Sequence, residues 1–202
     1  MAHFIFLEFS DPKVRDFLTS LRSSLAGRSI EKAIHVTIRG PYETYPDRQT
    51  LDSLQESLQG FGVTISGAGT FNTKNGYAVF LRVMSPIFSE IWWKPDFKIE
   101  EYGINPHVTV FETPIKAAAS KVEKFLRSER IQIFTLSFAL TVYTSKQLEL
   151  FDTYIDINPS VQKARRDNFG RWKVKRGIIQ RAATLHDELS KTTIDGSLMP
   201  SD

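Results

Sequence analysis

Apolar and polar positions alternate along this 202-residue chain in short blocks that predict mixed secondary structure. Apolar spacing of three or four residues predicts helices over residues 12–25, 47–58, 86–93 and 115–126. Shorter apolar or alternating blocks predict strands over residues 3–9, 32–39, 63–66, 69–72, 77–83, 107–111, 131–136, 139–143 and 148–157. Asp11 or Ser10 is a suitable cap for the first helix, and Gly40-Pro41 is expected to end the second strand.

The second half of the chain repeats the order of strands and helices predicted for the first half. This repetition predicts an α+β fold with two similar halves, mainly antiparallel sheets and helices outside them. A content of 41% hydrophobic residues is sufficient for a sizeable core. We therefore expect one domain over residues 1–157, built of two pseudo-symmetric lobes.

One four-residue pattern occurs twice, 72 positions apart, as His35-Val36-Thr37-Ile38 and His107-Val108-Thr109-Val110. Successive side chains of a strand point to opposite faces, so each histidine shares a face with the threonine two positions on. A single histidine in a strand is more often structural than catalytic. Neither His3 nor His186 has a threonine at this offset, however, so the repetition favours a functional pair. In a duplicated fold the two imidazoles would face each other across a groove.

Two histidines can supply both proton transfers that attack on a phosphodiester requires, one acting as base and the other as acid. On this interpretation His35 and His107 are the catalytic residues. Thr37 and Thr109 would donate hydrogen bonds to phosphate oxygens, where charge grows in the transition state. This chemistry requires no metal ion, cofactor or covalent intermediate.

Two further positions are candidates for substrate binding. By strand alternation Arg39 shares the face of His35, so it is either a phosphate contact or a surface arginine. Phe111 follows Thr109 by two positions, and it either stacks on a base or packs in the core.

Residues 158–202 differ in character from the rest of the chain. They contain 9 basic and 5 acidic residues, against 17 basic and 18 acidic in residues 1–157. We expect a basic C-terminal extension with a helix over residues 174–189. Its cations either form a solvated face or contact nucleic-acid phosphates, and Phe169 and Trp172 either stack on bases or anchor the extension to the core.

The absence of cysteine excludes disulfides, thiolate nucleophiles and cysteine–zinc sites. No His-Glu-x-x-His metal motif is present, so we expect no bound metal. The first apolar block stops at Glu8, which is too short for a signal peptide or a membrane span. These features predict a cytoplasmic protein, and we expect a monomer.

Both copies of the pattern resemble the signature motifs of the two-histidine (2H) phosphoesterase superfamily, which includes LigT-like RNA ligases and RNA cyclic phosphodiesterases. The resemblance covers residues 1–157. It implies a bilobal fold with a central cleft, His35 and His107 as general acid and base, and Thr37 and Thr109 as phosphate ligands. It also implies substrates with a 2′,3′-cyclic phosphate or a 2′–5′ linkage.

Three functions are compatible with these residues. The first is a metal-independent phosphoesterase that acts on RNA ends or oligonucleotides. The second is 2′–5′ RNA ligation, the reverse reaction, for which the same groups serve. The third is a non-catalytic RNA or nucleotide-binding protein, which would not need an acid–base pair.

Overall fold

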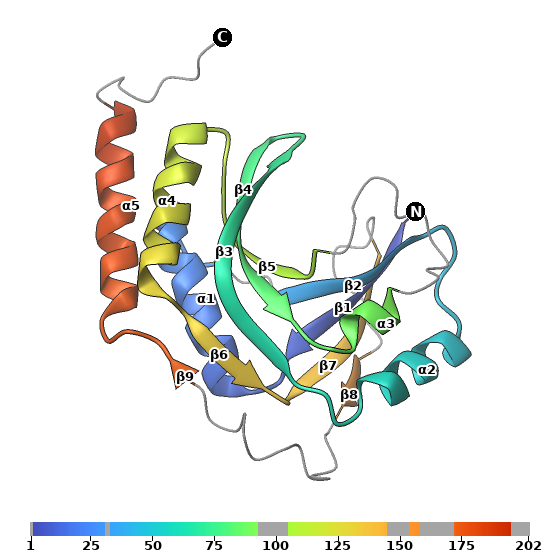
Figure 1. Cartoon of the computed structure of the whole chain (residues 1–202). Coiled ribbons are helices and arrows are strands. Elements are labelled where there is room, and N and C mark those ends of the chain that lie inside the picture. Colours follow the sequence, from blue (N-terminus) through green and yellow to red (C-terminus); the bar gives the residue numbers. More distant parts are fainter. Residues whose placement is uncertain (1, 31–32, 93–104, 145–153, 158–171, 195–202) are drawn as a thin grey trace.

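A computed structural model describes residues 2–30, 33–92, 105–144, 154–157 and 172–194 of the chain (Figure 1). The described strands are β1 (His3–Phe9), β2 (His35–Tyr42), β3 (Val63–Thr73), β4 (Gly76–Met84), β5 (His107–Thr113), β6 (Gln132–Thr135), β7 (Phe138–Thr144), β8 (Tyr154–Ile157) and β9 (Trp172–Lys173). The described helices are α1 (Pro12–Ala26), α2 (Arg48–Leu58), α3 (Phe88–Ile91), α4 (Lys116–Glu129) and α5 (Ile178–Ile194). The prediction of an α+β fold is confirmed.

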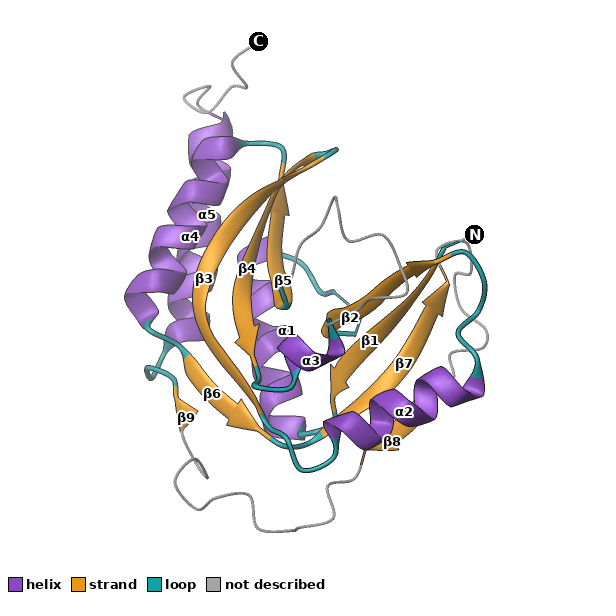
Figure 2. Cartoon of the chain, turned by 45° about the vertical axis from the view of Figure 1, so that its right-hand side comes forward, coloured by secondary structure: helices purple, strands orange, loops and turns teal. Residues whose placement is uncertain are grey.

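The strands form two antiparallel sheets (Figure 2). The first sheet has the order β2-β1-β7-β8, and the second has the order β5-β4-β3-β6-β9. Each sheet therefore combines strands that are distant in the sequence: β1 and β2 with β7 and β8 in the first, and β3 to β6 with β9 in the second. β2 and β5, which begin with the two motif histidines, occupy one outer position in each sheet.

Several strand boundaries differ from the prediction. The two strands expected over residues 63–72 are one strand, β3, whose pairing with β4 shifts register between Ile65 and Ala68. β2 begins at His35 and continues through Gly40-Pro41 to Tyr42. Proline is tolerated there because β2 lies at the edge of the described sheet, where one side of the strand needs no ladder donor.

The helical predictions are largely confirmed. α1 begins at Pro12 with Asp11 as its cap, whose carboxylate accepts the Lys13 N–H at 2.9 Å. Of the helix expected over residues 86–93, only the single turn α3 forms among the described residues. Residues 148–153 of the strand expected over 148–157 lie outside the described residues, and the rest of that segment forms β8.

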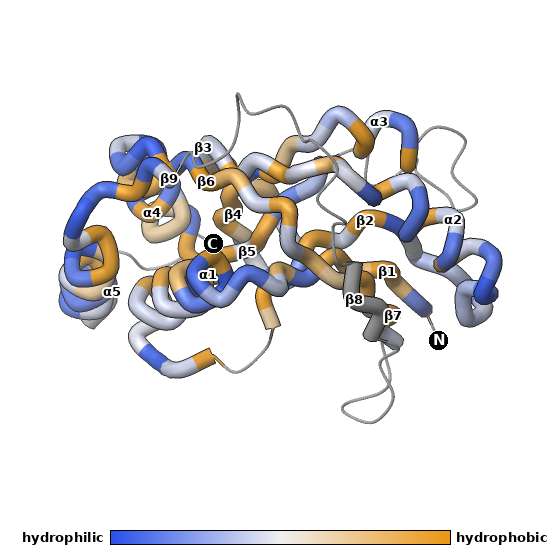
Figure 3. The backbone as a smooth tube through the Cα atoms, turned by 90° about the horizontal axis from the view of Figure 1, so that it is seen from below, coloured by the Kyte–Doolittle hydropathy of each residue, from blue (hydrophilic) through white to orange (hydrophobic). Residues whose placement is uncertain are grey.

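The apolar faces of both sheets and of the helices share one core. Helix α1 contributes the stripe Val14, Leu18, Leu21 and Leu25, which are all at most 1% exposed. Coloured by hydropathy, the central strands are mainly apolar, and polar residues lie on the outer faces of α2 and α5 (Figure 3). No helix among the described residues has the length and apolar content required to cross a bilayer.

Part of the predicted C-terminal extension packs on the rest of the fold. β9 pairs with β6, and α5 packs against α1 and α4. Trp172 makes an edge-to-face contact with Phe17, with 5.5 Å between ring centroids. The ammonium of Lys13 lies 4.3 Å from the centroid of the Trp172 ring. Trp172 therefore anchors the chain to the core. The helix expected over residues 174–189 is observed at Ile178–Ile194.

Polar contacts fasten helix α5 in place. Arg181 donates two hydrogen bonds to the buried carboxylate of Glu129, at 3.0 and 2.6 Å. The ring of His186 lies over Gly27, which ends α1 in the left-handed conformation, and a Cβ at Gly27 would overlap that ring. Several cations of the extension (Lys163, Arg165, Arg166 and Arg171), together with Phe169, lie outside the described residues.

Candidate active site

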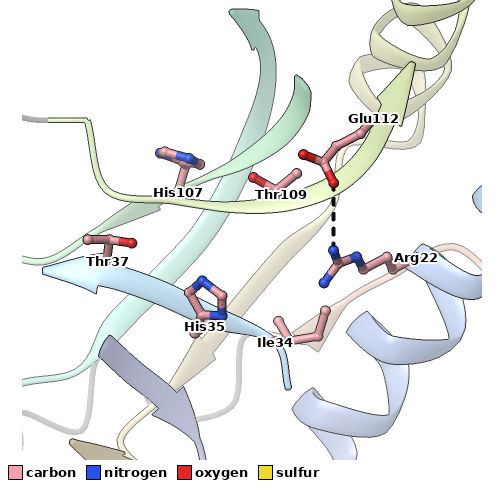
Figure 4. A pocket seen from close by; sticks show the side chains of 7 residues that line it. All are labelled: Arg22, Ile34, His35, Thr37, His107, Thr109 and Glu112. Atoms are coloured by element: carbon pink, nitrogen blue, oxygen red, sulfur yellow. Dashed lines mark ion pairs between the residues drawn. The ribbon is translucent and has the colours of Figure 1, made fainter. Parts of the chain in front are cut away.

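β2 and β5 lie side by side where the two sheets approach each other (Figure 2). A cleft of about 240 Å³ opens between them, and Figure 4 shows the side chains that line it. Its lining residues are Arg22, Ile34, His35, Thr37, His107, Thr109 and Glu112. The structure therefore brings together both histidines and both threonines that the sequence analysis selected. In Figure 4, His107 lies across from Thr37 and Thr109 lies across from His35, a diagonal arrangement.

Both catalytic candidates bond the backbone in the same way. The Nδ1 atom of His35 lies 3.2 Å from the carbonyl oxygen of Ala33, and that of His107 lies 2.5 Å from the carbonyl oxygen of Asn105. A carbonyl oxygen only accepts hydrogen bonds, so each Nδ1 must carry the proton. In the neutral imidazole this leaves Nε2 as the basic nitrogen. Each ring is thus held in the tautomer that a proton acceptor or shuttle requires.

An aromatic residue supports each histidine from the neighbouring strand. Phe6 of β1 pairs across from Thr37, and Phe80 of β4 pairs across from Thr109. The Phe6 ring stacks on His35 with 3.8 Å between centroids, and the Phe80 ring lies 5.1 Å from His107. The two halves of the cleft therefore have matching supports at matching register positions.

The third strand of each sheet extends this correspondence. Tyr143 of β7 stacks on Phe6 at 5.3 Å, and Phe71 of β3 contacts Phe80 at 5.4 Å. Phe71 also makes an edge contact with His107 at 5.0 Å. His107 therefore lies against two aromatic rings, whereas His35 lies against Phe6, which is itself stacked on Tyr143. These contacts limit the rotation of each imidazole.

Each motif strand carries a β-bulge one residue after its threonine. The pairing of β2 with β1 shifts so that Ile38 is the extra residue, and the pairing of β5 with β4 shifts so that Val110 is the extra residue. A bulge places two residues opposite one and resets the alternation of faces. The same irregularity therefore lies at the same position, three residues after the histidine, in both strands.

Regular alternation would place Arg39 and Phe111 on the faces of the motif histidines, and the bulges change that placement. Arg39 pairs across from the fully buried Ile5, so it does not share the face of His35 and does not line the cleft. Phe111 pairs across from the fully buried Val79 and packs against the core, also outside the cleft. Simple periodicity fails here because both residues follow a bulge.

Three residues that line the cleft were not selected from the sequence. Ile34 precedes the first motif. Glu112 reaches the cleft because the bulge moves it to the face of Thr109 and Phe80. Arg22 comes from α1. Its position in the sequence indicates that it is partly buried, because it follows Leu18 by four residues and so adjoins the apolar stripe of that helix.

Burial lowers the pKa of two residues in the cleft. It lowers the pKa of His107, and the hydrogen bond to Asn105 opposes this effect only in part. Burial also lowers the pKa of Arg22, against the opposing charge of Glu112 and in the same direction as the like charge of Arg28. His107 is therefore biased toward its neutral form, while arginine stays cationic at any physiological pH. The cleft thus combines a neutral imidazole, two hydroxyl donors and a cation.

The other two histidines have structural contacts. Nδ1 of His3 lies 2.9 Å from the Thr144 hydroxyl, and Nδ1 of His186 lies 3.1 Å from the Leu25 carbonyl oxygen. Among the described residues, no group of three His, Asp or Glu side chains is arranged to hold a metal ion. The sequence matches no known family model and has no significant match among curated proteins.

Proposed function

We propose that this protein is a metal-independent phosphoesterase that acts on RNA ends or oligonucleotides, opening 2′,3′-cyclic phosphates or cleaving 2′–5′ phosphodiester bonds. One observation carries the proposal: two histidines with the same backbone-bonded Nδ1, each followed by a threonine on its face, line one cleft. An isolated structural histidine would need neither a counterpart nor a shared cavity.

The chemistry follows from the positions of these groups. In opening a 2′,3′-cyclic phosphate, a neutral histidine accepts a proton from water through Nε2 while the water oxygen attacks phosphorus. The bond from phosphorus to one ribose oxygen breaks, and the second histidine, protonated on Nε2, donates its proton to that oxygen. The hydroxyls of Thr37 and Thr109 donate hydrogen bonds to the non-bridging oxygens, where negative charge accumulates.

The lowered pKa of His107 supports a division of these roles. A histidine that favours the neutral form suits the base in the hydrolytic direction. We therefore assign the base to His107 and the acid to His35 for opening the cyclic phosphate. The roles exchange in the reverse, ligating direction because the same proton transfers then run backward.

The matched halves of the cleft also support a duplicated, bilobal architecture of the two-histidine phosphoesterase type. The correspondence includes an edge strand, a histidine, a threonine, a bulge and a cross-strand phenylalanine in each sheet. Two unrelated strands would have no reason to share all five features. A pseudo-twofold axis through the cleft accounts for them together.

Turnover of 2′,3′-cyclic AMP by single-histidine variants tests the proposal. We expect His35→Ala and His107→Ala each to lower kcat by about 10²- to 10⁴-fold, the usual contribution of a general acid or base. His3→Ala and His186→Ala are the matched controls, because both residues lie outside the cleft, and they should keep activity close to wild type. EDTA should have no effect.

Chromatographic separation of 2′-AMP from 3′-AMP shows which phosphorus–oxygen bond breaks. Undiminished turnover in a folded His35→Ala or His107→Ala variant would contradict the acid–base assignment. Absence of wild-type turnover on both a cyclic phosphate and a 2′–5′-linked dinucleotide would reject the proposed function.

A further inference from the structure

The guanidinium of Arg22 lies at the end of the cleft away from Thr37 and close to Ile34 (Figure 4). Its side chain is 15% exposed, and within the described residues its one ion pair is with Glu112, at 3.9 Å between nitrogen and oxygen. That separation exceeds a hydrogen bond, and Glu112 itself is 66% exposed. A largely buried arginine thus has a distant and solvated counter-ion.

Such an arrangement is costly unless a ligand completes it. Burying a cation without close hydrogen-bond acceptors disfavours the charged form, and the nearby charge of Arg28 adds to the effect. A guanidinium presents five N–H donors in a planar fork that matches two oxygens of one phosphate. Replacing a distant carboxylate by a phosphate in direct contact would satisfy these donors.

Arg22 belongs to a different structural element from the histidines and threonines of the proposed reaction centre. It projects from the second-last turn of α1, whereas the histidines and threonines project from β2 and β5 (Figure 4). The diagonal histidine–threonine pairs already provide donors for the phosphate under attack. The cation is therefore available for a different anionic group of the same bound molecule.

We propose that Arg22 binds a second phosphate of the substrate, one that is not attacked. This inference rests on the proposed function and narrows its substrate class to nucleotides or oligonucleotides with at least two phosphates, such as a cyclic-phosphate end whose nucleotide also carries a 5′-phosphate. Glu112 is the counter-ion of Arg22 in the absence of that phosphate, and the phosphate replaces it on binding. Glu112 is thus a competitor for the cation and not a ligand of the substrate.

Calorimetric binding of two stable nucleotides tests this proposal without any turnover. The probes are adenosine 3′-monophosphate and adenosine 3′,5′-bisphosphate, which differ by one phosphate. We expect wild-type protein to bind the bisphosphate about tenfold more tightly or better, as one charge-assisted bidentate contact supplies. Arg22→Met should remove this preference, so that the variant binds the two nucleotides with similar affinity.

Matched variants separate the role of Arg22 from general electrostatics. Arg15 lies on the same helix, is 55% exposed and pairs with Asp16, so Arg15→Met should retain the full preference. Arg22→Lys should retain part of it, because a lysine keeps the charge and loses the fork. Glu112→Gln should strengthen bisphosphate binding by removing the competing carboxylate.

The inference is overturned if wild-type protein does not prefer the bisphosphate, or if a folded Arg22→Met variant keeps the preference. Should Arg22→Met not fold, an unchanged preference in Glu112→Gln together with an unchanged one in Arg22→Lys would overturn it. The proposed function is judged separately by turnover of 2′,3′-cyclic AMP in the histidine variants. Either proposal can therefore fail without the other.

Discussion

Replacing Phe80 by alanine is expected to destabilise the fold and to raise the pKa of His107 at the same time. Phe80 is 4% exposed, lies 5.1 Å from the His107 ring and covers it together with Phe71. Removing a buried phenylalanine ring costs about 3–5 kcal/mol of unfolding free energy, from lost burial and from the cavity left behind. The same cavity admits water beside His107, which weakens the desolvation that lowers its pKa.

The pH dependence has a defined sign. A histidine whose folded-state pKa is lowered binds fewer protons in the folded than in the unfolded protein, so wild-type stability falls on acidification through about pH 6.5. This loss is smaller in Phe80→Ala, because the His107 pKa lies closer to its ordinary value. The destabilisation of the variant relative to wild type should therefore be larger at about pH 7.5 than at about pH 5.5.

Urea unfolding at both pH values and an NMR titration of the His107 ring measure the two effects. Val79→Ala is the matched control: Val79 is fully buried on the core face of the same strand, and its truncation should cost about 2 kcal/mol. It should not move the His107 pKa. An unchanged His107 pKa in Phe80→Ala, or an equal shift in Val79→Ala, would refute the assignment of the pKa to burial by Phe80.

Three other substitutions test the supports of the site and the fold. Gly69→Ala should lower the free energy of unfolding by about 1–3 kcal/mol, because the added Cβ would lie 2.6 Å from the Phe80 ring. Adding Phe80→Leu to this variant should relieve part of that cost, and additive effects of the two substitutions would contradict the reasoning. Trp172→Ala should cost about 1–3 kcal/mol and increase proteolysis near α5, since the anchor to Phe17 is lost; unchanged protection would contradict this. Asp47→Ala should lower Tm at neutral pH, because the hydrogen bond from Thr50 lowers the Asp47 pKa and stabilises the folded state above the ordinary carboxyl pKa. That difference should vanish as the pH falls through the folded-state pKa, and a difference that persists in acid would refute the assignment to the ionised cap.

Much of the local structure follows from short-range patterns. β1 matches the apolar block of residues 3–9, and α1 begins where Pro12 and Asp11 indicate. A helix start depends on a cap and a first turn, both of which are encoded within four or five consecutive residues. The end of β2 was predicted wrongly because the effect of Gly40-Pro41 depends on whether a neighbouring strand needs its N–H.

The candidate site was likewise predictable from the sequence only in part. The motif spacing alone places His35 with Thr37, and His107 with Thr109, because alternation is a property of the extended backbone itself. Bringing the two pairs into one cleft required the packing of two sheets whose strands come from distant parts of the chain. No local pattern specifies that packing.

The amino-acid sequence by itself determined that His35 shares a face with Thr37, and His107 with Thr109, because side chains two residues apart on a strand point the same way. Tertiary structure alone decided what surrounds them. The bulges at Ile38 and Val110 arise from pairing with neighbouring strands, and they turn Arg39 and Phe111 away from the cleft. Arg22 enters from a helix that only the packing of α1 against β5 places there, because long-range burial and not nearby sequence sets that position.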